Sequence, residues 1–368
     1  MSQLNVKLGL QQRVLAAYRV PFFDKLAESC SRGLSVFAGQ PRLEESIETG
    51  KPEVAKYSAA RNWHILQGKF YLCYQRGLVN WLNTWQPDVL ILEANPRNLH
   101  SQAALRWMRE RNKPVLGWGL GVLGRNDFME PVRRRMRIRF LSQFDGMITY
   151  SQQGAANYIA QGFPPSRVFV APNAVASRPS QPPPNRMAHF SGGGPVVLFV
   201  GRLQTRKRVD FLLRACSSLP DRLKPDLWIV GDGPERFPLE TLASQIYPSA
   251  RFFGSCPPGE LTPFYQQADL FVLPGTGGLA VQQAMSFALP VLVAEADGTQ
   301  TDLVNPDNGW LLPPGDFPAL VRSLELALSD VSRLRKMGLA SYQIVDDKIN
   351  IENMVVVFIE AVRAVLEK

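Results

Sequence analysis

The chain has 368 residues, 45% of them hydrophobic and 20% charged, a composition typical of globular proteins that excludes a disordered or low-complexity chain. Its four cysteines lie far apart and it has only three histidines, so neither a disulfide scaffold nor a histidine-rich metal enzyme is expected. No signal-peptide core and no run of about 20 apolar residues occurs, so we expect a soluble, cytoplasmic protein.

The formal net charge of +9 is unevenly distributed along the chain. Residues 1–190 contain 25 Lys and Arg and 12 Asp and Glu, a net charge of +13, which leaves −4 for the remainder. The two halves are therefore expected to meet different partners.

Six short apolar runs in the first half predict strands that alternate with helical stretches. They are Arg13–Tyr18, Leu34–Phe37, Asp88–Glu93, Pro114–Gly119, Gly146–Tyr150 and Arg167–Ala171.

The segment Glu130–Phe144 predicts a basic amphipathic helix. Five arginines fall within seven positions, and an apolar residue recurs every fourth position. Such a helix could lie on an anionic lipid surface or could be a solvated helix that packs on its domain by the apolar stripe. Nucleic acid is not expected, because no recognition module accompanies the charge. The arginines are Arg133, Arg134, Arg135, Arg137 and Arg139, and the stripe is Val132, Met136 and Phe140.

The Pro- and Gly-rich stretch over residues 177–195 predicts an interdomain linker, because it disfavours both helix and strand. We therefore expect an N-terminal, acceptor-binding domain over residues 1–176 and a C-terminal domain over residues 196–345. A final apolar helix over residues 346–368 could pack back on the N-terminal domain.

The second half has the same alternation, with four unbroken apolar runs of the kind that is covered on both faces of a sheet. We expect two α/β domains with Rossmann-like parallel sheets, facing a cleft, with ligands bound at the carboxyl ends of the strands. The four runs are Val196–Val200, Asp226–Val230, Leu270–Pro274 and Pro290–Ala294.

Three segments that follow these strands could form one site. VGRLQTRKR places Arg202 and Lys207 before a helix, which suits a phosphate or diphosphate, although an isolated basic loop can also be merely solvated. VGDGP places Gly231 in a tight turn that lets the backbone approach a ligand. LPGTGGLAVQQAM carries three glycines at a helix start and could expose backbone N–H groups. This last segment matches neither the P-loop pattern nor GxGxxG.

In this order the segments resemble the donor-binding domain of the GT-B fold, in particular the family-4 group of retaining glycosyltransferases of bacterial polysaccharide and glycan biosynthesis. The resemblance extends over residues 196–312 and includes RFFGSC and NGWLLPPGD. It implies that Arg202 and Lys207 hold the diphosphate of a nucleotide-sugar and carry catalysis, and that Phe253–Ser255 meets the base. The donor-binding residues it implies are Gly201, Gly231, Phe253, Gly254, Ser255, Gly275, Thr276, Gly277, Gly278, Leu279 and Gln283.

Two positions of this sequence differ from the family, in which a glutamate at the first usually contacts the sugar and a glutamate at the second usually contacts the ribose. Gly275 and Gln283 stand in their places. Gln283 could still bond the ribose hydroxyls, but without the strength of a charge-assisted bond. A weaker or differently oriented donor sugar, or a site that no longer turns over, would follow.

On the acceptor side the residues are less informative. Leu120 stands where relatives often have histidine, His100 is the nearby histidine, and Arg19 points either toward the cleft or to the surface at a helix start. No general base is evident, which a retaining transfer tolerates if the departing diphosphate takes the acceptor's proton.

The sequence thus predicts a metal-independent hexosyltransferase-type enzyme without a cofactor, which uses a nucleotide diphosphate-sugar as co-substrate and a glycan or lipid-linked acceptor. It would be cytoplasmic and peripheral on the cytoplasmic membrane face. One alternative is a non-catalytic GT-B protein that binds nucleotide-sugar or scaffolds the same pathway. A sugar-nucleotide epimerase would need carboxylates and histidines that the chain largely lacks.

Overall fold

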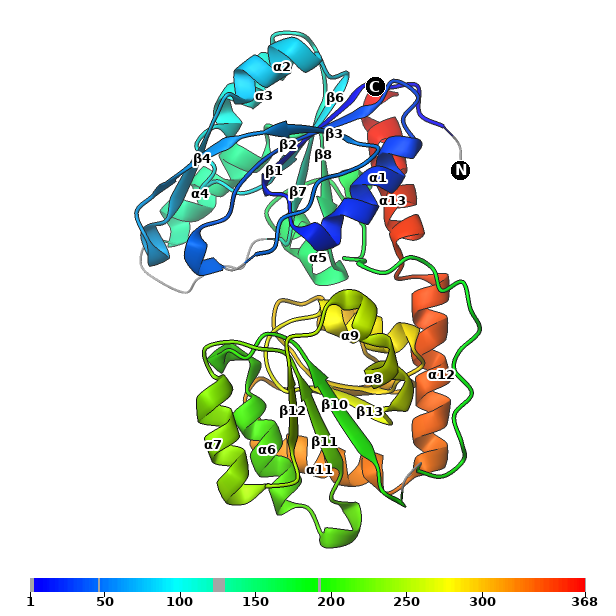
Figure 1. The fold of residues 1–368 in the computed structure, drawn as a ribbon. Helices are drawn as coiled ribbons and strands as arrows, with labels where there is room; N and C mark the ends of the chain where they lie inside the picture. Colours follow the sequence, from blue (N-terminus) through cyan, green and yellow to red (C-terminus); the bar gives the residue numbers. More distant parts are fainter. Residues whose placement is uncertain (1–2, 46, 122–129, 191–192, 368) are drawn as a thin grey trace. The chain divides into compact units, whose positions relative to one another are not determined.

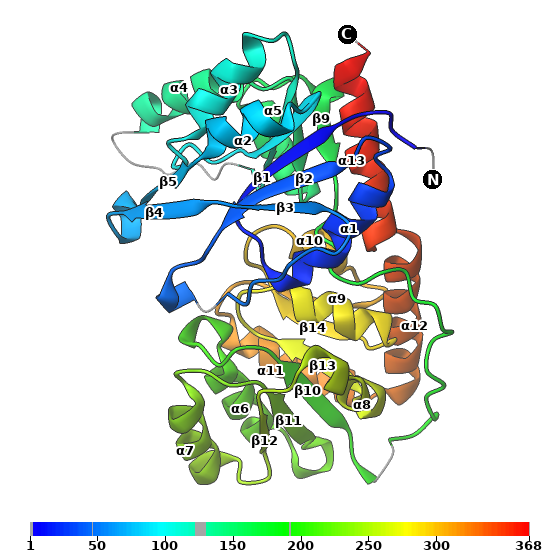
Figure 2. The ribbon, with the colours of Figure 1, turned by 45° about the horizontal axis from the view of Figure 1, so that its top comes forward.

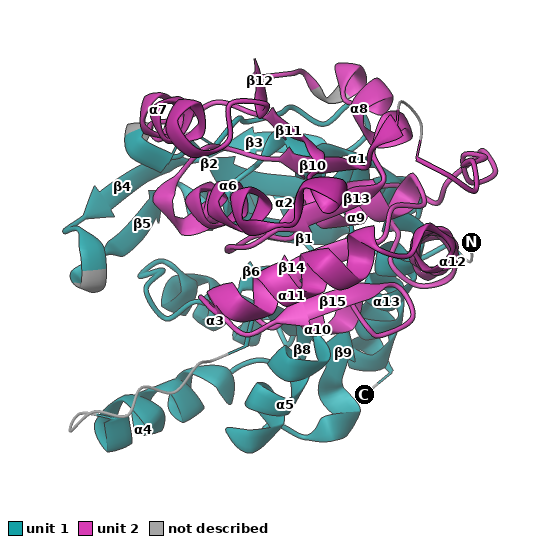
Figure 3. Ribbon diagram, turned by 90° about the horizontal axis from the view of Figure 1, so that it is seen from below, with its two compact units in different colours: residues 1–175, 351–368 teal, residues 176–350 magenta. Residues whose placement is uncertain are grey.

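The computed structural model describes residues 3–45, 47–121, 130–190 and 193–367. The chain forms two compact units: unit 1 comprises residues 1–175 with 351–368, and unit 2 comprises residues 176–350 (Figure 3). The stretch expected to be a linker therefore counts with unit 2, and the final helix counts with unit 1. No helix in the described ranges is long and apolar enough to cross a bilayer.

Unit 1 is built on a seven-stranded parallel sheet with the order β3-β2-β1-β6-β7-β8-β9 (Figures 1 and 2). The strands are β1 (Leu8–Val14), β2 (Leu34–Gly39), β3 (Lys56–Ala59), β6 (Val89–Glu93), β7 (Val115–Gly119), β8 (Gly146–Thr149) and β9 (Val168–Val170).

The strand expected over residues 13–18 is wrong. The first strand spans Leu8–Val14, and a 3₁₀ turn follows over Ala17–Arg19. Two buried glutamines, Gln11 and Gln12, interrupt the apolar run of this central strand, so a pattern of apolar residues does not predict it. The amide of Gln11 donates to Gln75 Oε1 at 2.6 Å, which removes the cost of burying it.

Helices cover both faces of the sheet of unit 1. The C-terminal helix α13 contributes Phe358, whose ring lies 4.8 Å from that of Phe22 and 5.0 Å from that of Trp118. All three side chains are fully buried in one core cluster, so residues distant in sequence close this core. The helices are α1 (Val20–Glu28), α2 (Leu78–Trp85), α3 (Ser101–Arg109), α4 (Glu130–Leu141), α5 (Gln152–Ala160) and α13 (Ile351–Leu366).

An antiparallel hairpin, absent from the sequence prediction, projects from unit 1 (Figures 1 and 2). Its strands are β4 (Arg61–Ile65) and β5 (Leu72–Arg76).

Unit 2 is built on a six-stranded parallel sheet with the order β12-β11-β10-β13-β14-β15. The strands are β10 (Val196–Val200), β11 (Asp226–Val230), β12 (Arg251–Gly254), β13 (Leu270–Leu273), β14 (Val291–Ala294) and β15 (Gly309–Leu312). The helices are α6 (Val209–Ser218), α7 (Arg236–Ile246), α8 (Thr262–Gln267), α9 (Leu279–Ser286), α10 (Gln300–Leu303), α11 (Phe317–Leu328) and α12 (Val331–Asp347).

Arg186 fixes part of the expected linker to unit 2. Its guanidinium donates to the carbonyl oxygens of Tyr265 at 2.8 Å and Phe287 at 2.9 Å, and also to that of Ala268. In the described part of residues 177–195, the prolines and glycines correctly excluded α-helix and strand. They did not predict that Arg186 would bind this segment to unit 2.

Each sheet has one topological switch point, where the order of strands reverses. It lies between β1 and β6 in unit 1 and between β10 and β13 in unit 2. Ligands of such sheets bind outside the carboxyl ends of the strands at these points.

Candidate functional site

A cavity of about 510 Å³ opens at the carboxyl ends of β10 and β11 in unit 2. It brings together four of the predicted residues, Gly201, Arg202, Gly231 and Ser255. Sequence reasoning missed the remaining lining residues, which are Val200, Val230, Asp232, Gly233, Cys256 and Leu261.

Glycine is required where the two strand ends meet. Gly231 has φ +140°, and a Cβ there would collide with the carbonyl of Gly201. The N–H of Gly201 donates to Val230 O at 2.9 Å, and that of Gly231 donates to Gly254 O at 2.7 Å. Because three strand ends lie so close together, this part of the cavity wall is formed by backbone atoms and not by side chains.

Lys207 lies at the switch point, beside the glycine-rich loop after β13. It ends the 3₁₀ turn Thr205–Lys207, and the N–H of Thr276 donates to Arg206 O at 3.0 Å. A Cβ on Gly277 would collide with the Nζ of Lys207. Burial, with a smaller contribution from the charge of Arg206, lowers the pKa of Lys207 to about 8.

Lys207 has no carboxylate partner within the described ranges. A part-buried ammonium without a counter-ion is costly, and an anion placed beside it would relieve that cost. Arg202 and Lys207 belong to one loop, Gly201–Lys207, which borders the cavity at one end and the glycine loop at the other.

The helix α9 begins after Gly278, the capping residue, and Leu279 is its first residue. The amide of Gln300 donates to Gly277 O at 2.8 Å and so fixes the loop that enters this helix. Gln283 is half-buried on α9, and its Oε1 accepts a bond of 3.4 Å from the hydroxyl of Tyr265. Its amide N–H groups remain the donors it could offer to a ligand.

Phe253 lies at the end of β12 with a partly exposed ring. Phe264 holds this ring at 4.8 Å between centroids, and Trp228 holds it at 5.7 Å. Gly254 follows with φ +75°, and its carbonyl is bonded to Gly231. The aromatic ring is therefore fixed two residues before Ser255, which lines the cavity.

The three acceptor-side candidates in unit 1 have different surroundings. Arg19 is buried, with its guanidinium 5.2 Å from the ring centroids of both Trp118 and Tyr150, so the alternative of a surface arginine is wrong. His100 is buried as well, its Nδ1 accepts the Gln75 N–H at 3.1 Å, and burial lowers its pKa to about 4. Leu120 is exposed.

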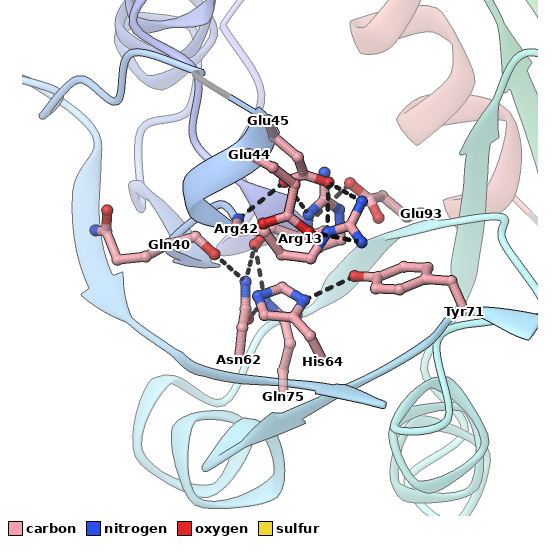
Figure 4. Close-up of polar contacts among 10 residues, drawn as sticks. All are labelled: Arg13, Gln40, Arg42, Glu44, Glu45, Asn62, His64, Tyr71, Gln75 and Glu93. Carbon is pink, nitrogen blue, oxygen red and sulfur yellow. Dashed lines mark hydrogen bonds and ion pairs between the residues drawn. The ribbon is translucent and has the colours of Figure 1, made fainter. Parts of the chain in front are cut away.

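Sequence reasoning missed Glu93, which lies at the switch point of unit 1 (Figure 4). Its carboxylate accepts the N–H of Arg13 at 2.8 Å and the amide of Asn98 at 2.9 Å. Burial raises the pKa of Glu93 above its usual range. The sequence could have indicated this residue, because Glu93 is an acidic residue at the end of the apolar strand DVLILE.

Arg13 connects Glu93 to a second carboxylate. Its side chain pairs with Glu45 at 2.8 Å, and Arg42 also bonds Glu45. Burial alone would raise the pKa of Glu45, but the bonds from Arg13 and Arg42 outweigh burial and lower it. Glu45 is therefore held as a carboxylate between two guanidinium groups at this end of the sheet.

The helix α4 differs from the expected stripe-packed helix. Phe140 is buried, but Val132 is exposed and Met136 is 67% exposed, so the stripe packs only at its C-terminal end. The side chain of Arg137 pairs with Glu130. Several arginines of α3, α4 and the loop after β6 line a groove of about 910 Å³, namely Arg97, Arg109, Arg133, Arg137 and Arg139.

Two family models match the chain. The Glycosyltransferase Family 4 model matches residues 33–177, and the Glycosyl transferases group 1 model matches residues 185–343. The chain belongs to the family-4-like glycosyltransferases of the GT-B fold. The expected family and the expected pair of Rossmann-like parallel sheets are confirmed.

Relatives of known activity align over part of their length. A GDP-mannose-dependent alpha-mannosyltransferase of Corynebacterium glutamicum is 35% identical over 193 residues, which are 51% of this chain and 43% of that protein. A D-inositol 3-phosphate glycosyltransferase of Nocardia farcinica is 30% identical over 239 residues, 59% of this chain and 52% of that protein. The alignments thus span about half the length of these relatives.

Solved structures match over nearly the whole chain. Sucrose-phosphate synthase from Thermosynechococcus elongatus has a TM-score of 0.73 at 17% identity and covers 98% of this chain and 99% of that one. Anabaena HepE in complex with UDP has a TM-score of 0.73 at 16% identity and covers 99% of this chain and 100% of that one. At these identities the likeness shows the fold alone.

In this glycosyltransferase the departure at Gly275 has a steric reason. A Cβ at Gly275 would collide with the carbonyl of Arg206 and the backbone of Lys207. Any larger residue, including the glutamate expected from the family, would need the two loops to move apart. Within the described residues, no group of three or more His, Cys, Asp or Glu is arranged to hold a metal ion.

Proposed function

We propose that the protein transfers a hexose from a nucleotide diphosphate-sugar to a glycan or lipid-linked acceptor, with retention of configuration. The observation that carries this proposal is the ammonium of Lys207, which lies without a carboxylate partner between a basic loop and a glycine loop. A diphosphate supplies the missing negative charge, and Arg202 at the cavity end of the same loop provides a second cation.

Transfer breaks the bond between the anomeric carbon and the diphosphate oxygen. Arg202, Lys207 and the start of α9 stabilise the charge that develops on the leaving diphosphate. The acceptor oxygen bonds the anomeric carbon on the face that the diphosphate leaves. The acceptor's proton passes to the departing diphosphate oxygen, so the step needs no protein base.

The nucleoside lies in the cavity at the ends of β10, β11 and β12. The base contacts Phe253 and Ser255, and the amide of Gln283 donates to the ribose hydroxyls. Since the protein's own cations neutralise the diphosphate, we propose a reaction independent of metal ions and cofactors. Chelation with EDTA should leave the rate unchanged, and a loss restored by Mg²⁺ would refute this independence.

We place the acceptor at unit 1, and we place the arginines of α4 on the cytoplasmic face of an anionic membrane that carries it. The exposed Val132 and Met136 support this placement, because they leave the first turns of α4 without apolar cover from the domain. Nucleic acid is not proposed as a partner.

A panel of UDP-, GDP- and ADP-sugars tests the donor by calorimetric binding and by transfer to a mixed glycan and lipid acceptor set. Arg202→Ala and Lys207→Ala should each weaken binding of the accepted donor by about ten- to a hundredfold, the value of one charge-assisted bond. Arg214→Ala and Lys336→Ala, which remove exposed charges on α6 and α12, are the controls. Full affinity in both site variants would refute the assignment, and product NMR at the anomeric carbon tests retention.

A non-catalytic nucleotide-sugar-binding protein is the second candidate, favoured by Gly275 and Leu120 at positions where relatives carry Glu and His. Binding that depends on Arg202 and Lys207, without turnover on any acceptor, would support it over the transferase.

A further inference from the structure

The two faces of the β4–β5 hairpin have opposite characters. Its register pairs Trp63 with Tyr74 on one face and His64 with Cys73 on the other. The inner face is buried or half-buried and consists of Asn62, His64, Cys73 and Gln75. The outer face consists of Arg61, Trp63, Ile65, Leu72, Tyr74 and Arg76.

The inner face anchors the hairpin to unit 1 (Figure 4). The amide of Gln75 donates to Asn62 Oδ1 at 2.8 Å and to Gln12 O at 3.0 Å, and Asn62 donates to Arg13 O at 2.8 Å. The N–H of Cys73 donates to Arg97 O at 3.0 Å. These bonds anchor the hairpin through its inner face, and the outer-face ring of Tyr74 adds a contact with the buried ring of His100, 6.5 Å between centroids.

The outer face changes in a regular order from root to tip. The cross-strand pairs are first cationic (Arg61 with Arg76), then aromatic (Trp63 with Tyr74) and finally aliphatic (Ile65 with Leu72). Beyond them, the turn exposes 61% of Leu66 and 76% of Phe70. Apolar character thus increases along the paired strands from root to tip, and the turn adds Gln67 and Lys69 beside its two large apolar side chains.

The charged side chains of the hairpin segment itself have one sign, although Glu45 and Glu93 lie beside its inner face. Between Val54 and Pro87 the sequence contains no acidic residue, whereas it contains Lys56, Arg61, Lys69 and Arg76. Arg97, whose carbonyl is bonded to β5, also lines the arginine groove of α4. The hairpin and α4 lie on the same side of unit 1 in Figure 1, and Figure 3 shows them well apart along that side.

We propose that the β4–β5 hairpin inserts its tip into an anionic phospholipid surface. The tip places Leu66 and Phe70 among the acyl chains, Trp63 and Tyr74 lie at the headgroup boundary, and Arg61 and Arg76 face lipid phosphates. This is the depth order that each side chain prefers at a membrane interface. The inference goes beyond the proposed reaction and does not depend on it.

Two other occupants fit less well. A glycan would need hydrogen-bonding groups on both sides of the rings of Trp63 and Tyr74, but Arg61 and Arg76 supply them only on the root side, and the pair toward the tip is Ile65 with Leu72. A second copy of the chain, docked through the same face, would bring Arg61 and Arg76 against their own equivalents, and like charges repel.

The test is co-sedimentation of the full chain with vesicles of phosphatidylglycerol and phosphatidylcholine, and with phosphatidylcholine alone. The parent protein should bind the anionic vesicles more strongly. The double variant Leu66→Ser with Phe70→Ser should lower the partition coefficient at least about tenfold, because two large apolar side chains are lost. The matched control is Leu339→Ser with Phe237→Ser, which removes an exposed leucine and a 78% exposed phenylalanine from α12 and α7 and should bind as the parent does.

A second measurement tests whether Trp63 lies in the bilayer. Lipids brominated in the acyl chain should quench part of the tryptophan fluorescence of the parent, and Trp63→Phe should remove that part. A parent that binds neither vesicle, or a hairpin double variant that binds as tightly as its control, would overturn the proposal. Dimerisation in sedimentation velocity that the hairpin variants abolish would assign the face to a second copy instead. Donor binding, measured on the same variants, reports separately on the proposed transferase.

Discussion

Lys207 and Gly277 share one small space at the switch point of the unit 2 sheet, because a Cβ on the glycine would collide with the Nζ of the lysine. Gly277 has φ +141°, a conformation that residues with a side chain rarely adopt. A methyl group at residue 277 would therefore force the lysine ammonium to shift.

Gly277→Ala should displace the Lys207 ammonium and reduce the rate of transfer by about 10²–10³, the usual cost of losing one donor that stabilises developing charge. Steady-state kinetics with a saturating acceptor measure the effect. Gly259→Ala is the control, since no atom lies within 4 Å of its Cβ position. Equal rates for the two variants would show that the lysine does not need this space.

Donor binding should weaken with increasing pH above the pKa of Lys207, which is about 8. The neutral amine offers no charge to a diphosphate, so the Kd should rise by up to about tenfold per pH unit until it reaches that of Lys207→Ala. Lys207→Arg should remain flat to higher pH, because a guanidinium stays protonated. Identical pH profiles for lysine and arginine would assign the titration to another group.

Lys207→Met should stabilise the ligand-free protein at pH 7. The pKa of Lys207 is lower in the folded protein than the ordinary value of 10.5, so the unfolded chain binds more protons between about pH 8 and 10.5. Stability from this group therefore rises with pH across that window, and below it the charged lysine lowers stability. A higher Tm for the methionine variant at pH 7, converging with the parent near pH 10, is the expected result.

Arg186→Ala should lower the free energy of unfolding of unit 2 by about 2–4 kcal/mol, because buried carbonyls lose charge-assisted donors. Burial, more than the nearby charge of Arg335, lowers the pKa of this guanidinium to about 10. Urea unfolding followed by tryptophan fluorescence gives the difference. Arg222→Ala, an exposed arginine after α6, should change stability little; a similar loss there would point to a general effect of charge.

Phe358→Ala should cost unit 1 about 3–5 kcal/mol, the range for truncating a large buried aromatic side chain. Its contacts with Phe22 and Trp118 would be replaced by a cavity. Val356→Ala on the same helix, at an exposed position, is the control. Calorimetry should show a lower transition for unit 1 alone, and an unchanged thermogram would contradict its role in that core.

The sequence predicted strands well where both faces are buried by apolar side chains. The expected bounds of β10 and β11 are those observed, because VVLFV and DLWIV are unbroken runs. The sequence did not predict the strand in which a buried polar residue forms a tertiary hydrogen bond. Gln11 interrupts the central strand of unit 1, and its partner Gln75 lies 64 positions away, so no local pattern reveals the pair.

The same limit applies to the candidate site. Glycines and cations placed after strands indicated the residues of unit 2, because parallel strands bring their carboxyl ends to one edge. The burial of Arg19 among aromatic rings and the pairing of Glu93 with Arg13 arise from tertiary packing between distant segments. Polar and apolar residues alternate over only a few positions in ARNWHI and LCYQR, too few to predict strands. Only the register of the hairpin shows that its outer face runs from cationic through aromatic to aliphatic pairs.

The helix α13 also constrains how the protein is made. Phe358 and its neighbours complete the core of unit 1, whose other strands and helices lie within residues 1–175. During synthesis, unit 2 can therefore finish folding while unit 1 still waits for residues 351–366 to leave the ribosome. Until then, the apolar surface of unit 1 that α13 covers stays exposed.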